Sequence, residues 1–374
     1  MAGKVALLAA GGTGGHLFPA EALAHELVGR GWQIHLATDH RAARFAEHFP
    51  AEAVHAIDSA TFGSRNPVAF LKSALTIWRG FRQASALMGR IRPAVVVGFG
   101  GYPTLPPVYA ATRRGVPTII HEQNAVMGRA NKALAPRVQA IAGGFLRPAG
   151  TQAGKIVTVG NPVRQTVLDV AETPYEPPAG DGAVRLLIFG GSQGARFFSD
   201  TMPEVIAQMP EALRSRLAVT HQARPEDEAR VRGRYDELGV KAEVAPFFAD
   251  LPARMATAHL VICRAGASSV LELSVIGRPS VLVPLPHALD DDQGHNAGIL
   301  TEAGGALLRR QNEIDIATLG GELAGLLGDG ARLAAMAEAA KSVGRTDATR
   351  LLADLTEAIA SGVSVGQFKE GSGS

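Results

Sequence analysis

Short apolar runs alternate with longer amphipathic stretches along most of the chain. The runs are rich in Val, Ile, Leu and Ala, which is typical of strands buried on both faces. We expect eight such strands: KVALLAA, QIHLATD, AVVVGFG and PTIIHEQ in the first half, and RLLIFGG, LAVTHQA, LVICRAG and SVLVPLP in the second. Helices are expected between them, for example from Leu17 to Arg30 and from Ser268 to Ile276. This alternation predicts βαβ units with parallel sheets.

One local pattern occurs in both halves of the chain. ALLAAGGTGGHL near the start and LLIFGGSQGARF in the second half each run from an apolar strand through glycines into a helix. The second series of strands follows a Pro- and Gly-rich linker, TPYEPPAGDGA, at 173–183. A length of 374 residues suits two domains. The predicted fold class is therefore α/β, with two Rossmann-like domains on parallel sheets facing each other across a cleft.

The composition is that of a globular protein, with 46% hydrophobic residues. Cys263 is the only cysteine, so no disulfide can form within the chain, and we interpret it as a buried apolar residue. The apolar run at the start ends at Gly11 and is too short for a secretory signal. No run reaches the roughly 20 apolar residues that span a bilayer, so any membrane contact is expected to be peripheral.

Charge is distributed unevenly between the two halves. Residues 1–168 hold 18 Lys and Arg against 7 acidic residues, a balance of +11, and residues 169–374 hold 19 against 28, a balance of −9. From Ser59 to Leu168 there are 14 basic residues and one acid, Glu122. A solvated basic face would account for part of this bias, but its extent favours an anionic partner.

The glycines of the repeated pattern indicate phosphate binding. Between a buried strand and a helix, glycines let the backbone approach a ligand, while free N–H groups and the positive end of the helix dipole point outward. Neither loop has the Walker sequence or GxGxxG. Asp39 stands where a ribose-binding acid of an NAD enzyme would lie, so an NAD-dependent oxidoreductase is one alternative. A nucleic-acid-binding protein that uses the basic half is another, but this half contains no recognisable RNA or DNA module, so we expect no nucleic-acid partner.

Six ordered motifs resemble those of the MurG family of peptidoglycan N-acetylglucosaminyltransferases. They are GGTGGH at 11–16, GGY at 100–102, HEQN at 121–124, GNPVR at 160–164, GGSQGA at 190–195 and GASSVLE at 266–272. The resemblance runs from Val5 to about Ala360. It implies inverting transfer of GlcNAc from UDP-GlcNAc to the undecaprenyl-diphosphate-linked muramyl pentapeptide (lipid I), which gives lipid II. Another lipid glycosyltransferase of the same fold, with a different acceptor, is the closest competitor.

The resemblance also implies the two-domain GT-B fold. Residues 1–162 would form an acceptor- and membrane-associated domain, joined by a C-terminal helix at about 347–361, and residues 163–346 would bind UDP-GlcNAc. Residues 362–374 are expected to be a flexible tail. The protein would be peripheral on the cytoplasmic side of the bacterial plasma membrane, with an anionic membrane surface and cell-wall synthesis proteins as partners.

On the donor side, the resemblance implies a set of substrate-binding residues. Glu272 would accept hydrogen bonds from the ribose hydroxyls, the backbone near Phe248 would bind uracil, and Arg164 would balance diphosphate charge. The diphosphate and sugar contacts would come from Ser192, Gln193, Ala267, Ser268, Ser269, Asp292, Gln293 and Asn124. Asp292 departs from the commoner amide or imidazole, and Ser199 replaces a common Asn. No cofactor or metal is implied, because the closest approach to a DxD motif, DDD at 290–292, falls in the segment assigned to the sugar.

The catalytic residues are expected in the basic half. His16 is a candidate base, because its side chain ordinarily titrates near neutrality, or alternatively a donor to a substrate phosphate. Glu122 is the second candidate base, with pairing to an arginine as its structural alternative. Thr13, Gly14, Gly15 and Tyr102 would line the same site and bind substrate.

The segment FLKSALTIWRGFRQ, at 70–83, predicts a helix with an apolar stripe beside cations. The stripe consists of Leu71, Leu75, Trp78 and Phe81. Core packing is the ordinary explanation of such a stripe. Aromatic residues flanked by lysine and arginine also suit an anionic headgroup layer, and the resemblance implies a peripheral membrane patch here.

Overall fold

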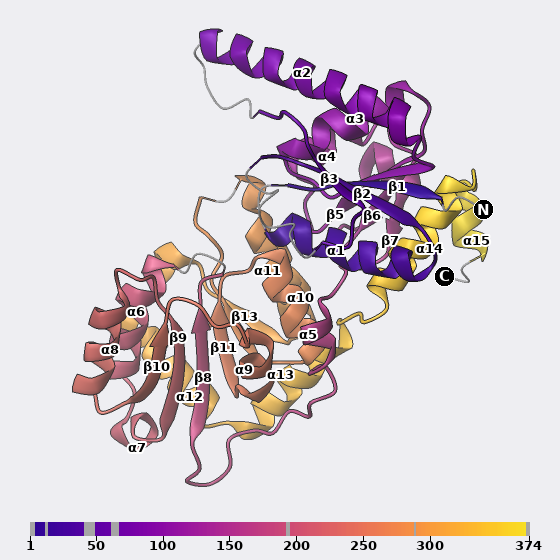
Figure 1. Ribbon diagram of the computed structural model, residues 1–374. Coiled ribbons are helices and arrows are strands. Elements are labelled where there is room, and N and C mark those ends of the chain that lie inside the picture. Colours follow the sequence, from indigo (N-terminus) through magenta and orange to yellow (C-terminus); the bar gives the residue numbers. More distant parts are fainter. Residues whose placement is uncertain are drawn as a thin grey trace. The chain divides into compact units, whose positions relative to one another are not determined.

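The computed structural model describes residues 4–11, 14–40, 49–60, 67–191, 195–287 and 289–371. These residues form two compact units (Figure 1). Unit 1 contains the described residues up to Arg164 and those from Thr346 onward, and unit 2 runs from Gln165 to Arg345. Each unit is described by itself below.

Unit 1 is built on a seven-stranded sheet with the order β3-β2-β1-β4-β5-β6-β7. Every paired register in it is parallel, for example Leu8 beside Leu36 and Val97. The strands are β1 (Val5–Ala9), β2 (Gln33–Thr38), β3 (Ala53–Ala56), β4 (Val95–Gly98), β5 (Thr118–Glu122), β6 (Ala140–Gly143) and β7 (Ile156–Thr158). Their central members are apolar at consecutive positions because both faces of the sheet are covered by helices.

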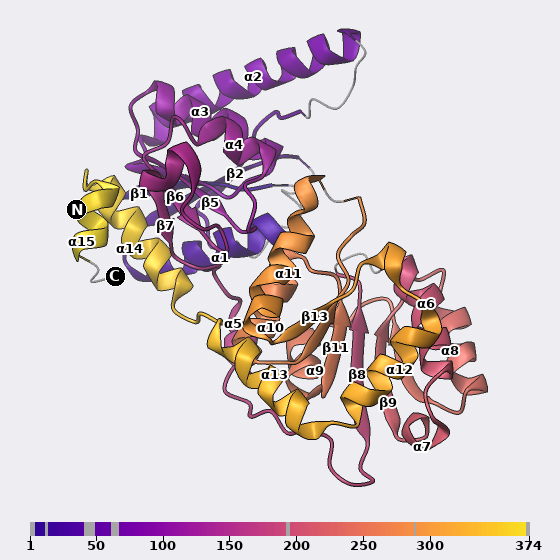
Figure 2. The same ribbon diagram turned by 180° about the vertical axis from the view of Figure 1, so that it is seen from behind.

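Helices cover both faces of this sheet (Figures 1 and 2). The helical segments of unit 1 are α1 (Gly14–Gly29), α2 (Pro67–Ile91), η2 (Tyr102–Thr104), α3 (Leu105–Arg113), α4 (Arg129–Leu134), η3 (Gly150–Lys155), α14 (Ala348–Ala360) and α15 (Val365–Gly371). One core layer joins the sheet to α1 and α14, and a second layer joins it to α2, α3 and α4. The sheet is therefore doubly wound, as βαβ units require.

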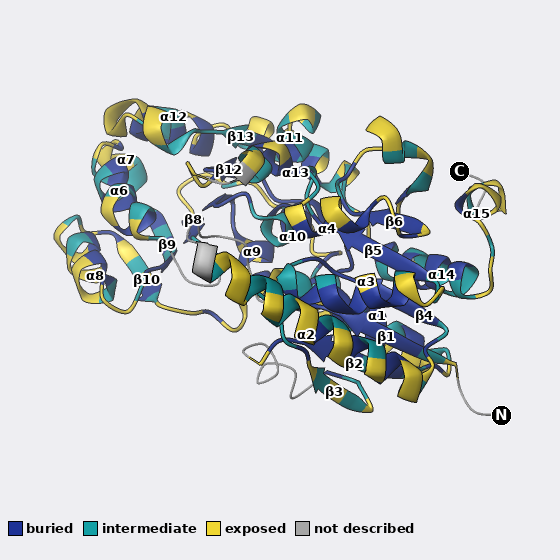
Figure 3. Ribbon diagram, turned by 90° about the horizontal axis from the view of Figure 1, so that it is seen from above, coloured by how far each residue is buried: buried dark blue, intermediate teal, exposed yellow. Residues whose placement is uncertain are grey.

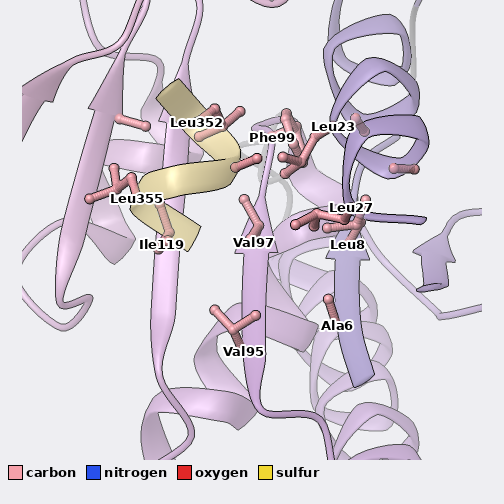
Figure 4. Packing of buried hydrophobic residues seen from close by; sticks show 14 of the residues in the cluster. Ala6, Leu8, Leu23, Leu27, Val95, Val97, Phe99, Ile119, Leu352 and Leu355 are labelled. Atoms are coloured by element: carbon pink, nitrogen blue, oxygen red, sulfur yellow. The ribbon is translucent and has the colours of Figure 1, made fainter. Parts of the chain in front are cut away.

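The helix α14 belongs to the core of unit 1 although it lies near the end of the chain. Its Leu352 and Leu355 pack with the sheet and with α1, around Leu8, Val97 and Ile119 (Figure 4). Hydrogen bonds join its polar face to the turn after α1, at the edge of this core layer. Arg30 donates to Asp354 and Glu357 at 2.7 and 2.8 Å, and Trp32 Nε1 donates to Glu357 at 2.9 Å.

The prediction of a flexible tail at residues 362–374 is wrong for most of that segment. Residues Val365–Gly371 form α15. Val365 is buried in the core of unit 1, and Phe368 packs against that core. The sequence GQFKEG contains few apolar residues, so their burial depends on tertiary contacts that its composition does not reveal.

Unit 2 has a six-stranded parallel sheet with the order β10-β9-β8-β11-β12-β13. Its strands are β8 (Val184–Phe189), β9 (Leu217–Gln222), β10 (Lys241–Ala245), β11 (Leu260–Cys263), β12 (Ser280–Leu282) and β13 (Ala306–Leu308). Its helical segments are α5 (Gln165–Leu168), α6 (Arg196–Ala207), α7 (Glu211–Arg214), α8 (Glu228–Glu237), α9 (Leu251–Thr257), α10 (Ala267–Ile276), η4 (Leu289–Asp291), α11 (Asp292–Ala303), η5 (Gln311–Glu313), α12 (Ile316–Leu327) and α13 (Gly330–Ser342).

The Pro- and Gly-rich stretch 173–183 lies inside unit 2 and does not separate the two units. The fully buried Arg278 donates to the carbonyls of Thr173 and Pro174, and it also bonds the last carbonyls of α9 and α10. Tyr175 adds a bond of 2.9 Å from its hydroxyl to His259 O. These bonds give the buried guanidinium its acceptors, and they hold the stretch to the rest of unit 2.

Candidate functional site

The functional motifs lie at the carboxyl edges of the two sheets. In a doubly wound sheet, ligands bind where strand order reverses, outside the carboxyl ends of the strands. In unit 1 the order reverses between β1 and β4, and these strands lead into GGTGGH and GGY. In unit 2 it reverses between β8 and β11, which lead into GGSQGA and GASS. Both repeated glycine loops therefore stand at a switch point.

The two glycine turns of unit 1 pack against each other. Gly100 and Gly101 have φ values of 87° and 76°, which glycine adopts readily. A Cβ on Gly100 would lie 3.0 Å from Cδ2 of His16, and one on Gly11 would lie 2.4 Å from Cγ of Pro103. Because glycine has no Cβ, the GGY turn can pack closely against the start of α1, and His16 lies beside it.

Burial changes the acid–base behaviour of His16. Its imidazole packs against Gly100, and burial lowers its pKa to about 4. The ordinary value near neutrality, which made His16 attractive as a base, does not hold in this structure. A neutral imidazole remains the dominant form at pH 7, so its ring can still accept a proton or donate a single N–H.

His121 is locked in one tautomer within the HEQN motif. Its Nε2 lies 3.2 Å from Gly160 O, and because a carbonyl only accepts, Nε2 carries the proton. Its Nδ1 accepts from Gln123 Nε2 at 3.1 Å. Burial is the main reason that the pKa of His121 is lowered to about 4, although the hydrogen bond to Gly160 opposes this shift. His121 is a structural bridge between the HEQN and GNPVR motifs.

Glu122 is buried, and its two oxygens accept four hydrogen bonds. One oxygen accepts from the backbone and side chain of Asn124, both at 3.1 Å. The other accepts from Gly128 N and from Asn131 Nδ2, both at 2.9 Å. These donors come from the loop that follows Glu122 and from Asn131 of α4, rather than from the arginine expected as its structural alternative. Such an arrangement holds the loop that presents Asn124.

The GNPVR motif is tied to the same loop. Asn161 Nδ2 donates to Gln123 O at 2.9 Å, and the side chain of Asn161 fills the space above Gly144, where a Cβ would lie 1.9 Å from its Oδ1. Arg164, the last residue of unit 1, stacks over Phe18 in the first turns of α1 at 5.0 Å. The structure therefore brings Arg164 to the helix that follows the first glycine loop.

The remaining unit 1 candidates are placed by these turns. Gly14 and Gly15 begin α1, and the half-buried Tyr102 opens η2 directly after the GGY turn. Thr13 lies outside the described residues, as do Ser192 and Gln193 of the second loop.

In unit 2 the GASS turn forms the start of α10. Ala267, Ser268 and Ser269 are its first three residues, all partly exposed, and Glu272 follows one turn later with its side chain largely buried. Gly191 has a φ of 94°, and Gly190 N donates to Gln222 Oε1 at 3.2 Å. Adjacent pairing of β8 with β11 places this glycine turn next to the N-terminus of α10.

Arg264 links the two turns of unit 2 and has no counterpart among the sequence-based candidates. Its guanidinium stacks against Phe197 and Phe198, at the start of α6, at 5.4 and 5.2 Å. It also donates to Val283 O and to Gln311 Oε1, at 3.1 and 2.6 Å. A single arginine directly before GASS gives no sign of these long-range contacts in the sequence.

Asp292 and Gln293 begin α11. Burial raises the pKa of Asp292, and its Oδ1 accepts from Gln293 N at 2.8 Å. Gln293 Oε1 accepts from Leu285 N at 2.9 Å, which fixes the direction of its amide. Phe248 is buried after β10, and Arg254 stacks over its ring at 4.3 Å.

Comparisons with known proteins agree with this arrangement. The model of the glycosyltransferase family 28 N-terminal domain matches residues 6–142, and that of the C-terminal domain matches residues 185–352. The chain is 65% identical over 370 residues to the UDP-N-acetylglucosamine–N-acetylmuramyl-(pentapeptide) pyrophosphoryl-undecaprenol N-acetylglucosamine transferase of Chelativorans sp., covering 99% of both chains. It is 60% identical to the protein of the same name from Brucella abortus, covering 98% of this chain and 97% of the relative.

Solved structures show the same fold. The crystal structure of Acinetobacter baumannii MurG matches with a TM-score of 0.78 and 28% identity, over 95% of this chain and 99% of that one. A glycosyltransferase of kitacinnamycin matches with a TM-score of 0.69 and 21% identity, over 96% and 100% of the two chains. With two α/β units on parallel sheets, this is the GT-B fold. The chain belongs to the MurG family, within glycosyltransferase family 28.

Proposed function

We propose that the protein transfers GlcNAc from UDP-GlcNAc to the C4 hydroxyl of MurNAc in lipid I, giving lipid II for peptidoglycan synthesis. The observation that carries this proposal is identity of 60–65%, over nearly the whole chain, to relatives named for this reaction. The site geometry supports it, because glycine turns stand at the switch point of each sheet and suit a phosphate-bearing ligand.

The donor is assigned to unit 2, Gln165–Arg345, whose bounds differ by one or two residues from the 163–346 expected from the sequence. Backbone amides of the second glycine loop and of Ala267–Ser269 hold the diphosphate, together with Ser192 and Gln193. Glu272 binds the ribose, and the backbone at Phe248 binds uracil. Asp292 and Gln293 hold the GlcNAc hydroxyls, with Asn124 contacting the sugar or its acetamido group. Arg164 and the helix N-termini stabilise charge on the departing UDP.

The acceptor is assigned to unit 1, where Thr13, Gly14, Gly15 and Tyr102 bind it. The C4 oxygen attacks the anomeric carbon as the bond to the UDP oxygen breaks, so UDP leaves with the bonding electrons. The hydroxyl proton passes to His16, whose neutral imidazole has an acceptor nitrogen. Because its pKa is about 4 in this structure, proton removal occurs late, as the nucleophile becomes acidic during attack. Glu122 holds the loop and is not assigned proton transfer.

Membrane contact is assigned to the first half of α2. Leu71, Leu75 and Trp78 are exposed by 70, 47 and 52%, and Phe70, which sequence reasoning did not single out, by 57%. Exposed positions of α2 are yellow in Figure 3. Arg82 stacks on Trp78 at 5.1 Å, as suits an anionic headgroup layer. Phe81 does not belong to this face, because it packs on the core and against Tyr109 at 5.6 Å.

The exposed apolar face of α2 supports peripheral membrane contact. The side is assigned from the proposed reaction, which places the protein on the cytoplasmic side of the bacterial plasma membrane. Within the described ranges, no helix has the length and apolar character needed to cross a bilayer. Cell-wall synthesis proteins are the expected protein partners.

A transfer assay tests the proposed function. Radiolabelled UDP-GlcNAc with a lipid I analogue is compared with UDP-glucose and with a diacylglycerol acceptor. Label should move to the lipid I analogue from UDP-GlcNAc, at least about tenfold faster than in either substituted reaction. Equal transfer to diacylglycerol would identify a lipid glycosyltransferase of another specificity.

A further inference from the structure

An ion pair joins the segment after β13 to the start of α11. Arg310 donates to both carboxylate oxygens of Asp291, each at 2.6 Å, in the bidentate geometry that arginine favours. This pairing lowers the pKa of Asp291 and raises that of Arg310. Both side chains keep partial contact with solvent, so the pair contributes little to overall stability. Its acid, Asp291, lies directly before Asp292 and Gln293, the proposed sugar contacts.

Asp291 lies in a strained turn. Asp290 and Asp291 have φ values of 58° and 49°, the left-handed region, where residues other than glycine are uncommon. Such a conformation persists only when the surroundings enforce it. The Asp291 carboxylate lies over Gly294, where a Cβ would come within 2.4 Å of Oδ2. The carboxylate is thus held between Arg310 and the first turn of α11.

Arg310 stands on a segment that is fixed on both sides. Its predecessor Arg309 forms an ion pair with Glu322 of α12. Its successor Gln311 accepts from Arg264, which stacks on the start of α6. A guanidinium on such an anchor loses little freedom when it pairs, so it can dictate the position of a turn that is itself strained.

We propose that Arg310 and Asp291 are positioning residues for donor-sugar recognition. The pair sets the left-handed turn, and that turn aims Asp292 and Gln293, the next two residues, at the GlcNAc hydroxyls. The inference rests on the proposed function, because it takes Asp292 and Gln293 as sugar contacts. It adds a determinant outside the motifs, 19 residues along the chain from Asp291.

Consecutive arginines offer a matched pair of variants. Arg309→Gln and Arg310→Gln each remove one bidentate ion pair of similar exposure, yet only Arg310 reaches the strained turn. Calorimetry with the full chain gives Kd for UDP and for UDP-GlcNAc, and the melting temperature checks folding. In Arg310→Gln, affinity for UDP-GlcNAc should fall about fivefold with UDP affinity unchanged. Arg309→Gln should change neither, and Asp291→Asn should match Arg310→Gln.

The outcomes separate the inference from the function on which it rests. If the original protein binds both ligands and Arg310→Gln weakens both equally or neither, the positioning role is wrong and the function stands. If the original protein binds neither ligand, both proposals fail. A double variant, Asp291→Asn with Arg310→Gln, should lose no more sugar affinity than either single variant, and additive losses would show that the two residues act separately.

Discussion

At the residue scale, the buried histidines are the clearest departure from solution behaviour. Burial lowers the pKa of His16 and His121 to about 4 and that of His221 to about 3, from a normal value of 6.5. Above pH 6.5 these histidines are mostly neutral in both the folded and the unfolded state, so they do not lower the free energy of unfolding. Below 6.5 only the unfolded state gains protons, and each histidine removes about 1.4 kcal/mol per pH unit.

The contribution of these three histidines to the free energy of unfolding should therefore fall by about 4 kcal/mol between pH 7.5 and 5.5. His259, whose pKa burial also lowers to about 4, should add to this loss. Denaturant titrations at these two pH values measure the change. A flat profile would mean that the three rings are accessible to solvent.

Glu122→Gln tests the role assigned to that carboxylate. A glutamine has one acceptor oxygen, so its NH₂ group would face two N–H donors, either those from Asn124 or those from Gly128 and Asn131. We expect unit 1 to lose about 3 kcal/mol of stability. Denaturant unfolding measures it, with the exposed Glu52→Gln as the control. Unchanged stability with lost transfer would return Glu122 to the list of bases.

His16→Ala should lower kcat far more than it raises the donor KM, by about 100-fold or more if His16 takes the proton. Because the imidazole is already neutral, kcat of the unaltered protein should not drop as the pH passes 6.5. Steady-state kinetics at saturating acceptor measure both quantities. An unchanged kcat in the variant would reject the catalytic role.

At the scale of elements, α2 is divided into an exposed half and a core half. Leu87 and Met88, near its end, are buried against the sheet, whereas Leu71, Leu75 and Trp78 face solvent. Changing these three exposed residues to Ser should weaken sedimentation with anionic vesicles at least about tenfold and leave UDP-GlcNAc binding intact. The comparison variant Phe81→Ser should instead lower the melting temperature. Loss of donor binding in the triple variant would place the three side chains in the core.

The sequence predicted the centres of both sheets better than their edges. All eight expected strands are confirmed, because continuous apolar runs mark strands buried on both faces. The edge strands β3, β7, β10 and β13 and the inner β6 were not expected from the sequence. They have three to five residues each, and some include polar residues, as in AVHA and KAEVA. These segments become strands because they pair with neighbouring strands, and a local sequence pattern does not show which strands will pair.

The same limit applies to the site. Local motifs were enough to identify the glycine turns, Glu272 and the start of α10 as candidate site residues. The four donors around Glu122 and the contact of Arg310 with Asp291 join residues without a shared motif. The His16 ring packs against Gly100, a residue far along the chain. Properties that arise where distant segments meet could not be predicted.

At the scale of the whole molecule, the two units share one device and differ in charge. Each has a glycine turn at the switch point of a parallel sheet, and the basic half of the chain forms most of unit 1. We propose that each unit binds one substrate, the nucleotide sugar on unit 2 and the lipid-linked acceptor on unit 1.

Hydrogen exchange of the full chain, with and without UDP-GlcNAc, tests this division most directly. We expect the donor alone to slow exchange in the segments 189–196, 264–272 and 285–294, and the lipid I analogue to slow it in 10–17 and 99–104. Slowed exchange by UDP-GlcNAc confined to 10–17 and 99–104 would contradict the assignment of the donor to unit 2.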